Sequence, residues 1–82
     1  MKEDVRLIIR KRVGERIRQI RTHRNLSLRD LEAISGIDYS WLGKLETGKV
    51  NFSMDSLTKL MKALKIQPGD LFDFKVTYKD ED

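Results

Sequence analysis

The chain has 82 residues, no cysteine and a formal net charge of +4. A chain of this length forms one domain with a small core, and the lack of cysteine excludes disulfides, thiolate metal sites and a cysteine nucleophile. Residues 1–29 carry ten Lys or Arg against three acidic residues, whereas residues 30–82 carry seven Lys against ten acidic residues. The basic N-terminal part suits a partner rich in phosphate, such as nucleic acid, with a solvated helix face as the alternative.

The first predicted element is a long helix over residues 4–24. Apolar residues recur along it at helical spacing and form one stripe, which consists of Val5, Ile9, Val13, Ile17 and Ile20. Gly14 interrupts this pattern, so it marks either a kink or the true start of the helix.

Two short helices are predicted next, over residues 28–35 and 39–47, joined by a tight turn. Their apolar residues occupy one face of each helix: Leu28, Leu31 and Ile34, then Ile37, Leu42 and Leu45. Ser27 and Asp38 are suitable N-caps, and Gly36 can adopt the positive φ that ends a helix. The pattern is typical of a helix-turn-helix, whose second helix can enter the DNA major groove, or of an αα-hairpin in any small helical bundle.

A fourth helix, capped by Ser53, follows a short loop, and Pro68 suits the first position of a short helix over residues 68–72. Residues 74–79 alternate apolar and polar side chains, which predicts a short strand. Residues 80–82 are expected to form a frayed acidic end. No run is long and apolar enough for a membrane span or a signal segment, so no membrane partner is expected. The lack of cysteine suits a reducing cytoplasm, so we expect a cytoplasmic protein.

The segment SLRDLEAISGIDYSWLGKLETGK carries a resemblance to a known family. It contains a Leu-x-x-x-x-Gly-Ile element and a Leu-Glu-x-Gly-Lys ending, and the matching residues are Leu31, Gly36, Ile37, Leu42, Leu45, Glu46, Gly48 and Lys49. Over about residues 13–72 the chain resembles the Cro/repressor-type (Xre-like) helix-turn-helix family. Its overall size, long first helix and acidic tail are most similar to stand-alone regulators of that family, such as restriction-modification controller proteins.

The resemblance implies an all-α fold, a compact five-helix lambda-repressor-like domain over residues 1–82 with an extended N-terminal helix and a tail over residues 73–82. It also implies sequence-specific binding of double-stranded DNA by a homodimeric transcriptional regulator on a pseudo-palindromic operator. An antitoxin or coactivator-type protein-interaction module, with a toxin or another protein as its partner, is the alternative. A binder of DNA or RNA without sequence preference is the third interpretation.

Catalysis is not expected from this sequence. His23 is the only histidine, and the five glycines are scattered rather than gathered in a phosphate-binding loop. No nucleophile motif and no metal-ligand spacing occurs. The sequence therefore predicts no enzyme activity, no cofactor and no metal site.

The outward face of the helix over residues 39–47 supplies the candidate DNA contacts. Tyr39 and Ser40 lie at the end of the helix that meets base edges, and Lys44, one turn further on, can reach a guanine or a phosphate. Asp38 is a base-reading candidate whose competing role is helix capping. Contacts with the DNA backbone are assigned to Arg29, Trp41, Thr47, Lys49 and Asn51. For Trp41, packing against the fourth helix is the alternative.

The remaining assignments concern structure and assembly. The resemblance pairs Glu46 with Arg21 as an ion pair between the first and third helices. Glu32 stands where the family usually has Ala, so it must extend outward or find a cationic partner. A dimer interface is predicted from apolar residues that a small core cannot hide, namely Leu71, Phe72, Phe74, Val76 and Tyr78. The alternative is a tail that folds back on its own subunit and covers Ile9 and Val13.

Overall fold

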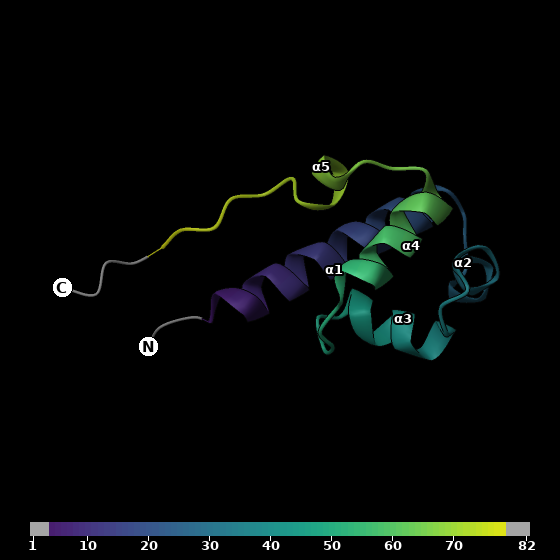
Figure 1. Cartoon of the computed structure of the whole chain (residues 1–82), viewed down its shortest axis with the longest axis horizontal. Helices are drawn as coiled ribbons and strands as arrows, with labels where there is room; N and C mark the ends of the chain where they lie inside the picture. Colours follow the sequence, from purple (N-terminus) through teal and green to yellow (C-terminus); the bar gives the residue numbers. More distant parts are fainter. Residues whose placement is uncertain (1–3, 79–82) are drawn as a thin grey trace.

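The computed structural model describes residues 4–78. Within this range the chain folds into five helices: α1 (Val5–His23), α2 (Leu28–Ser35), α3 (Tyr39–Glu46), α4 (Met54–Leu64) and α5 (Pro68–Leu71). The long helix α1 contacts α3 and α5, while α2 contacts α3 and α4. The start of α1 and the end of the described tail lie at one end of the molecule and α2 lies at the other (Figure 1). The all-α prediction is confirmed, and α2 and α3 form the expected helix-turn-helix.

Side-chain caps fix where the short helices begin and end. The Ser27 Oγ accepts the Asp30 N–H (3.0 Å), and the Asp30 carboxylate accepts the Ser27 N–H (2.8 Å), which completes a capping box at α2. Ser53 and Ser56 form the equivalent box at α4. Gly36 ends α2 in the left-handed conformation at φ 75°, which glycine adopts without a steric cost. Local sequence therefore fixes where α2 begins and where it ends.

A single apolar cluster forms the core. It consists of Val13, Ile17, Ile20, Leu31, Leu42, Leu45, Leu57, Leu60, Leu64 and Leu71. α2 contributes only Leu31 to this cluster. Ile34, which was expected on the same face, is 51% exposed. A three-residue step changes the direction of the side chain by about 60° around the helix axis. Ile34 lies one such step from the buried Leu31, on a side of α2 that faces solvent.

Two glycines lie where α1 meets the end of α3. α1 runs through Gly14 without interruption, so this glycine does not start a new helix. Instead, Gly14 is buried against the carbonyl group of Leu45. Gly48 follows α3 with φ 74°, and its backbone lies against Lys11 of α1. The absence of side chains at these two positions lets α1 and the end of α3 approach closely.

The C-terminal tail differs from the sequence prediction. Residues 74–78 form no strand, so the strand predicted over residues 74–79 is wrong for the part that the structure describes, while Lys79 and residues 80–82 lie outside that part. A strand requires hydrogen bonds to a neighbouring strand, and the described part of this chain offers the tail no such partner. The tail runs back beside the N-terminal half of α1 (Figure 1), where the Arg12 guanidinium lies 5.5 Å from the centroid of the Phe74 ring.

None of the helices between residues 4 and 78 is long and apolar enough to cross a membrane.

Candidate nucleic-acid interface

Asp38 caps the N-terminus of α3. Its Oδ2 accepts hydrogen bonds from the Ser40 N–H (3.1 Å), the Ser40 hydroxyl (2.6 Å) and the Trp41 N–H (3.0 Å). The hydrogen bond from the Ser40 side chain, followed by that from the Trp41 N–H, holds the pKa of Asp38 below its ordinary value of 3.8. The Asp38 carboxylate therefore serves the helix terminus, and the Ser40 hydroxyl donates its proton to it.

Two side chains of α2 converge on Tyr39, the first residue of α3. The Glu32 Oε2 accepts the Tyr39 backbone N–H (3.1 Å), and the Arg29 guanidinium carbon lies 4.2 Å from the centroid of the Tyr39 ring. The sequence predicted that Glu32 would extend outward or bind a cation. Its side chain is partly buried, and its partner is the backbone N–H at the start of α3 rather than a cation. Side chains of α2 thus hold both the backbone N–H and the ring of Tyr39.

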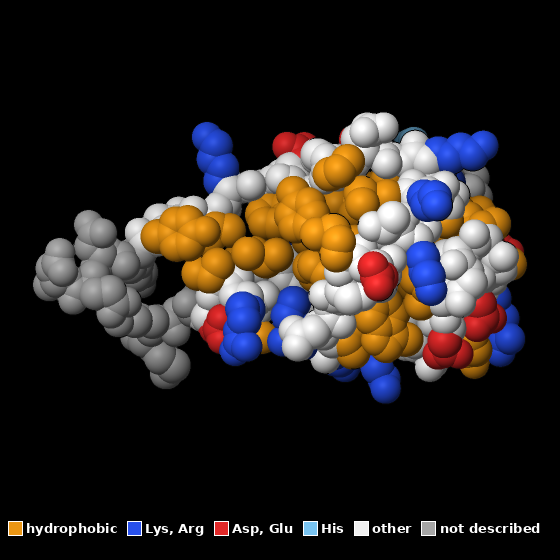
Figure 2. Space-filling view, viewed as in Figure 1, with side chains coloured by type: hydrophobic (Ala, Val, Ile, Leu, Met, Phe, Trp, Pro, Cys, Tyr) orange, Lys and Arg blue, Asp and Glu red, His pale blue; other side chains and the backbone are white. Residues whose placement is uncertain are grey.

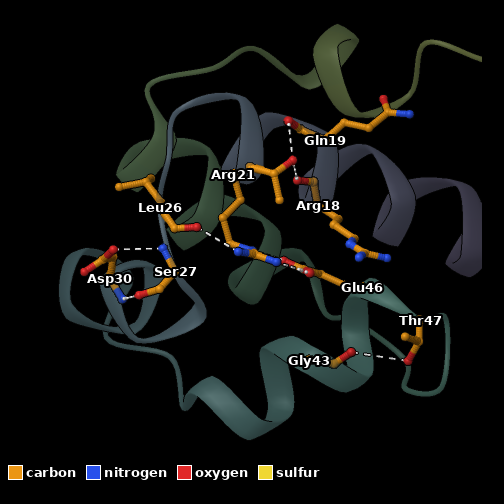
Figure 3. Close-up of polar contacts among 10 residues, drawn as sticks. Arg18, Gln19, Arg21, Leu26, Ser27, Asp30, Gly43, Glu46 and Thr47 are labelled. Atoms are coloured by element: carbon orange, nitrogen blue, oxygen red, sulfur yellow. Dashed lines mark hydrogen bonds and ion pairs between the residues drawn. The ribbon is translucent and has the colours of Figure 1, made fainter.

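The rest of α3 divides into a buried and an exposed side. Leu42, Leu45 and Glu46 are buried, while Ser40 and Lys44 are exposed. Thr47 is exposed too, and its hydroxyl donates to the carbonyl oxygens of Gly43 (3.2 Å) and Lys44 (3.1 Å); Figure 3 shows the bond to Gly43. Trp41 is partly buried and packs against the core.

The loop after α3 is anchored to α1. The Arg10 Nε donates to the Val50 carbonyl (3.1 Å), and the Lys49 N–H donates to the Lys44 carbonyl (2.9 Å). The side chains of Lys49 and Asn51 are exposed. The loop is therefore held by its backbone, while its two polar side chains remain accessible on the chain segment that directly follows α3.

An ion pair locks α1 to α3 from the inside. The Arg21 Nε donates to the Glu46 Oε2 (2.6 Å), and its second terminal nitrogen donates to the Oε1 (2.9 Å). The remaining Arg21 nitrogen donates to the Leu26 carbonyl (2.7 Å), so one guanidinium joins three segments (Figure 3). The side chains are only 12% and 5% exposed. The hydrogen bond to Glu46 raises the pKa of Arg21, so this guanidinium stays charged.

The residues expected to mediate dimerisation lie away from α3. Arg12, which contacts the tail, and Gly14, which contacts α3, are two residues apart and so point to opposite sides of α1. Leu71 has no exposed surface and belongs to the core of its own chain. The prediction that Leu71 lies in a dimer interface is therefore wrong, because the short helix α5 turns this side chain inward.

The tail residues differ in how much surface they expose. Phe72 is 42% exposed and Tyr78 is 73% exposed, while Phe74 and Val76 are partly buried. The Phe72 and Phe74 rings lie 6.1 Å apart, and Phe74 packs against the core. This contact agrees in part with the alternative of a tail folded back on its own subunit.

Two residues that hold α3 and the loop after it were not identified from the sequence. Glu32 caps α3 from a distance of seven residues, and Arg10 holds the loop at Val50 from a distance of 40 residues. Neither spacing belongs to a local capping or turn motif. The departure of Glu32 from the small residue usual at its position was the only sequence signal for its role.

The fold and the exposed side of α3 define a helix-turn-helix DNA-binding protein, because α2 holds α3 at a fixed angle with its polar side accessible. Comparison with known proteins supports this class. Residues 16–76 match the model of the Cro/C1-type HTH DNA-binding domain. The chain therefore belongs to the Cro/C1-type helix-turn-helix family, which is a family of DNA-binding regulators rather than of enzymes.

Individual relatives agree with this assignment. The control protein C.BamHI of Bacillus amyloliquefaciens is 35% identical over 75 residues, which span 90% of this chain and 88% of the relative. The crystal structure of the restriction-modification controller protein C.AhdI from Aeromonas hydrophila superposes with a TM-score of 0.72 at 40% identity, covering 76% of this chain and 94% of that one. The controller protein C.Esp1396I, in a tetramer with its 35 base-pair operator, gives a TM-score of 0.72 at 25% identity, covering 87% and 90%.

Proposed function

We propose that this protein is a homodimeric transcriptional regulator that binds a pseudo-palindromic DNA operator in the control of a restriction-modification system. The observation that carries the proposal is the division of α3, which buries Leu42 and Leu45 and exposes Ser40 and Lys44, in a chain of the Cro/C1-type family. The restriction-modification system is proposed as the regulated target because relatives of this chain are named as control or controller proteins. One recognition helix reads few base pairs, and two related by a two-fold axis read enough for an operator.

The first turn of α3 is assigned to base reading. Tyr39 contacts a base edge or a thymine methyl group, and Lys44 reaches a guanine or a phosphate. The Ser40 hydroxyl donates to Asp38, so toward a base it acts as an acceptor. Asp38 contributes by fixing the helix terminus rather than by contacting a base, since its Oδ2 already accepts three hydrogen bonds.

Contacts with the DNA backbone are assigned to one residue of the recognition helix and to residues on either side of that helix. Their N–H, ammonium and hydroxyl groups can donate to phosphate oxygens, the Thr47 hydroxyl only by releasing its bonds to Gly43 and Lys44. Such contacts fix the position of the protein on the duplex without reading sequence. These residues are Arg29, Trp41, Thr47, Lys49 and Asn51. The anchoring of the loop by Arg10 supports this role for Lys49 and Asn51, because a held backbone loses little freedom when a phosphate binds.

A second copy of the chain is assigned to the tail. Hydrophobic side chains gather over the tail (Figure 2). The interface we propose contains Phe72, Phe74, Val76 and Tyr78, with Phe74 shared between its own core and the partner. Burial of such exposed apolar area is the common driving force of subunit association.

The test is selection of duplexes from a randomised DNA pool by the full chain, followed by sequencing of the bound molecules. We expect an inverted repeat to be enriched, and the same sequence to occur upstream of the gene that encodes this protein. Bound duplexes that share no common sequence would indicate binding without sequence preference. Failure to retain any duplex, together with a second protein that copurifies with the chain, would favour the protein-interaction module instead.

A further inference from the structure

Tyr39 is held at two independent points by the helix that precedes it. Glu32 bonds its backbone N–H at 3.1 Å, and Arg29 covers its ring at 4.2 Å. These two residues lie three positions apart on α2, so both side chains can be directed to the same side of that helix. The first bond fixes where α3 begins, and the second fixes the direction of the aromatic ring.

Each contact has a separate physical effect. A carboxylate that accepts a free N–H at a helix N-terminus is a charge-assisted hydrogen bond, favoured further by the helix dipole. A guanidinium over an aromatic face is attracted by the negative charge of the ring face and restricts the rotation of the ring. The guanidinium edge keeps N–H donors that the stacking does not use, so Arg29 can bind a phosphate while it covers Tyr39.

We propose that Glu32 and Arg29 are positioning residues that determine how well Tyr39 discriminates between operator and other DNA. This inference rests on the proposed function, in which Tyr39 reads a base. Discrimination between bases requires a contact group to be held in one geometry before binding, because a mobile ring adapts to the wrong base as easily as to the right one. Arg29 also links this geometry to the DNA backbone, since one guanidinium touches the ring and is accessible to a phosphate.

The experiment compares full-length variants by the ratio of their affinities for the selected operator and for random duplex of the same length. Arg29→Ala and Glu32→Ala should each lower this ratio about fivefold to tenfold, a part of the discrimination that one good base contact supplies. Glu32→Gln retains an acceptor oxygen for the Tyr39 N–H and should preserve most of the ratio. Lys62→Ala, which removes an exposed cation on α4, is the matched control and should leave the ratio unchanged.

A double-mutant cycle separates positioning from other roles. In a Tyr39→Ala background, Arg29→Ala should have no further effect on the ratio, since the ring that Arg29 covers is gone. A simple loss of a phosphate contact at Arg29 would weaken operator and random DNA equally and would leave the ratio intact. Thermal melting of each variant shows whether the fold survives, and Arg29 is exposed, so its variant tests the ring contact even if Glu32→Ala is unstable.

The failure of this inference is distinguishable from the failure of the proposed function. If Tyr39→Ala lowers the ratio but Arg29→Ala and Glu32→Ala do not, Tyr39 reads DNA without the two positioning residues and the inference is overturned. If Tyr39→Ala leaves the ratio unchanged, the assignment of base reading to Tyr39 is wrong, and the inference falls with it.

Discussion

A Cβ atom placed on Gly14 would lie 2.1 Å from the carbonyl oxygen of Leu45. The obstacle is backbone rather than a flexible side chain, so neither α1 nor α3 can accommodate it without a shift of the whole element. The closest approach between the long helix and the proposed recognition helix therefore depends on one absent methyl group.

Gly14→Ala should destabilise the protein despite the higher helix propensity of alanine. Overpacking of a core typically costs about 1–3 kcal/mol, and in a domain of this size each kcal/mol lowers the melting temperature by about 4–8 °C. Thermal unfolding followed by circular dichroism measures the effect. Gly69→Ala is the control, because no atom lies within 4 Å of a Cβ at Gly69. Equal melting temperatures for the two variants would show that α1 and α3 can separate at little cost.

Glu46→Gln tests the ion pair with Arg21. The substitution leaves the guanidinium charge in a site where the two side chains are only 12% and 5% exposed, and the removal of one partner of a buried pair costs about 3–5 kcal/mol. Chemical denaturation should show this loss as a lower midpoint with an unchanged slope. Asp4→Asn removes a charge from the exposed pair with Arg6 and should have almost no effect. A Glu46→Gln midpoint equal to that of Asp4→Asn would mean that water replaces the pair.

Lys49→Ala tests the proposed backbone contact after α3. Loss of one phosphate contact should weaken operator and random duplex alike, and should make the slope of log K against log salt shallower by about one unit. Fluorescence anisotropy at several salt concentrations gives the slope. Lys62→Ala is the control for the change in net charge. If Lys49→Ala and the unmodified protein give the same slope, Lys49 lies outside the interface.

Asp38 makes the stability of α3 depend on pH in the acid range. Its folded-state pKa lies below the ordinary value of 3.8, so its cap stabilises the protein above that value and loses its effect as the pH falls through the folded-state pKa. Asp38→Asn keeps a capping oxygen without the charge and should therefore lose less stability than the original protein between about pH 5 and pH 2. Thermal melts across this range make the comparison, and parallel curves would contradict it.

The proposed tail interface predicts that assembly and folding respond to different residues. A Phe72→Ser and Tyr78→Ser double variant should weaken the dimer in analytical ultracentrifugation, because it removes exposed apolar surface. Its melting temperature at concentrations where the protein is monomeric should change little. Leu71→Ala should do the opposite by opening a cavity in the core, at a cost of about 2–5 kcal/mol. Unaltered association of the double variant would remove the exposed tail side chains from the interface.

Elements fixed by local rules were predictable from the sequence. The bounds of α2 agree with the prediction because Ser27, Asp30 and Gly36 determine both of its ends. The burial of Leu42 and Leu45 followed from their three-residue spacing. The pairing of Arg21 with Glu46 came from the family resemblance rather than from the spacing of the two residues, and the structure places them in contact.

Features that depend on how distant segments meet were not predictable in this way. The contact of Gly14 with Leu45 arises only where α1 crosses α3. From the sequence alone, a glycine within a helical pattern is equally consistent with a helix interruption and with a close helix contact. Leu71 was assigned to a dimer interface because the sequence shows that its side chain is apolar but does not show that α5 turns it into the core. The tail alternates like a strand, yet alternation without a neighbouring strand does not form one.

α1 has 19 residues and is therefore about 28 Å long at 1.5 Å per residue. One of its sides holds the recognition helix through Arg21, and the other carries the tail through Arg12. In the proposed dimer, the separation of the two recognition helices is thus set by a stiff rod in each subunit. One extra base pair at the operator centre displaces the half-sites by about 3.4 Å and rotates them by about 35°. If the two subunits of the proposed dimer move as rigid bodies, they cannot follow that screw motion, and the proposed dimer should then select the length of the operator centre as well as the bases on either side of it.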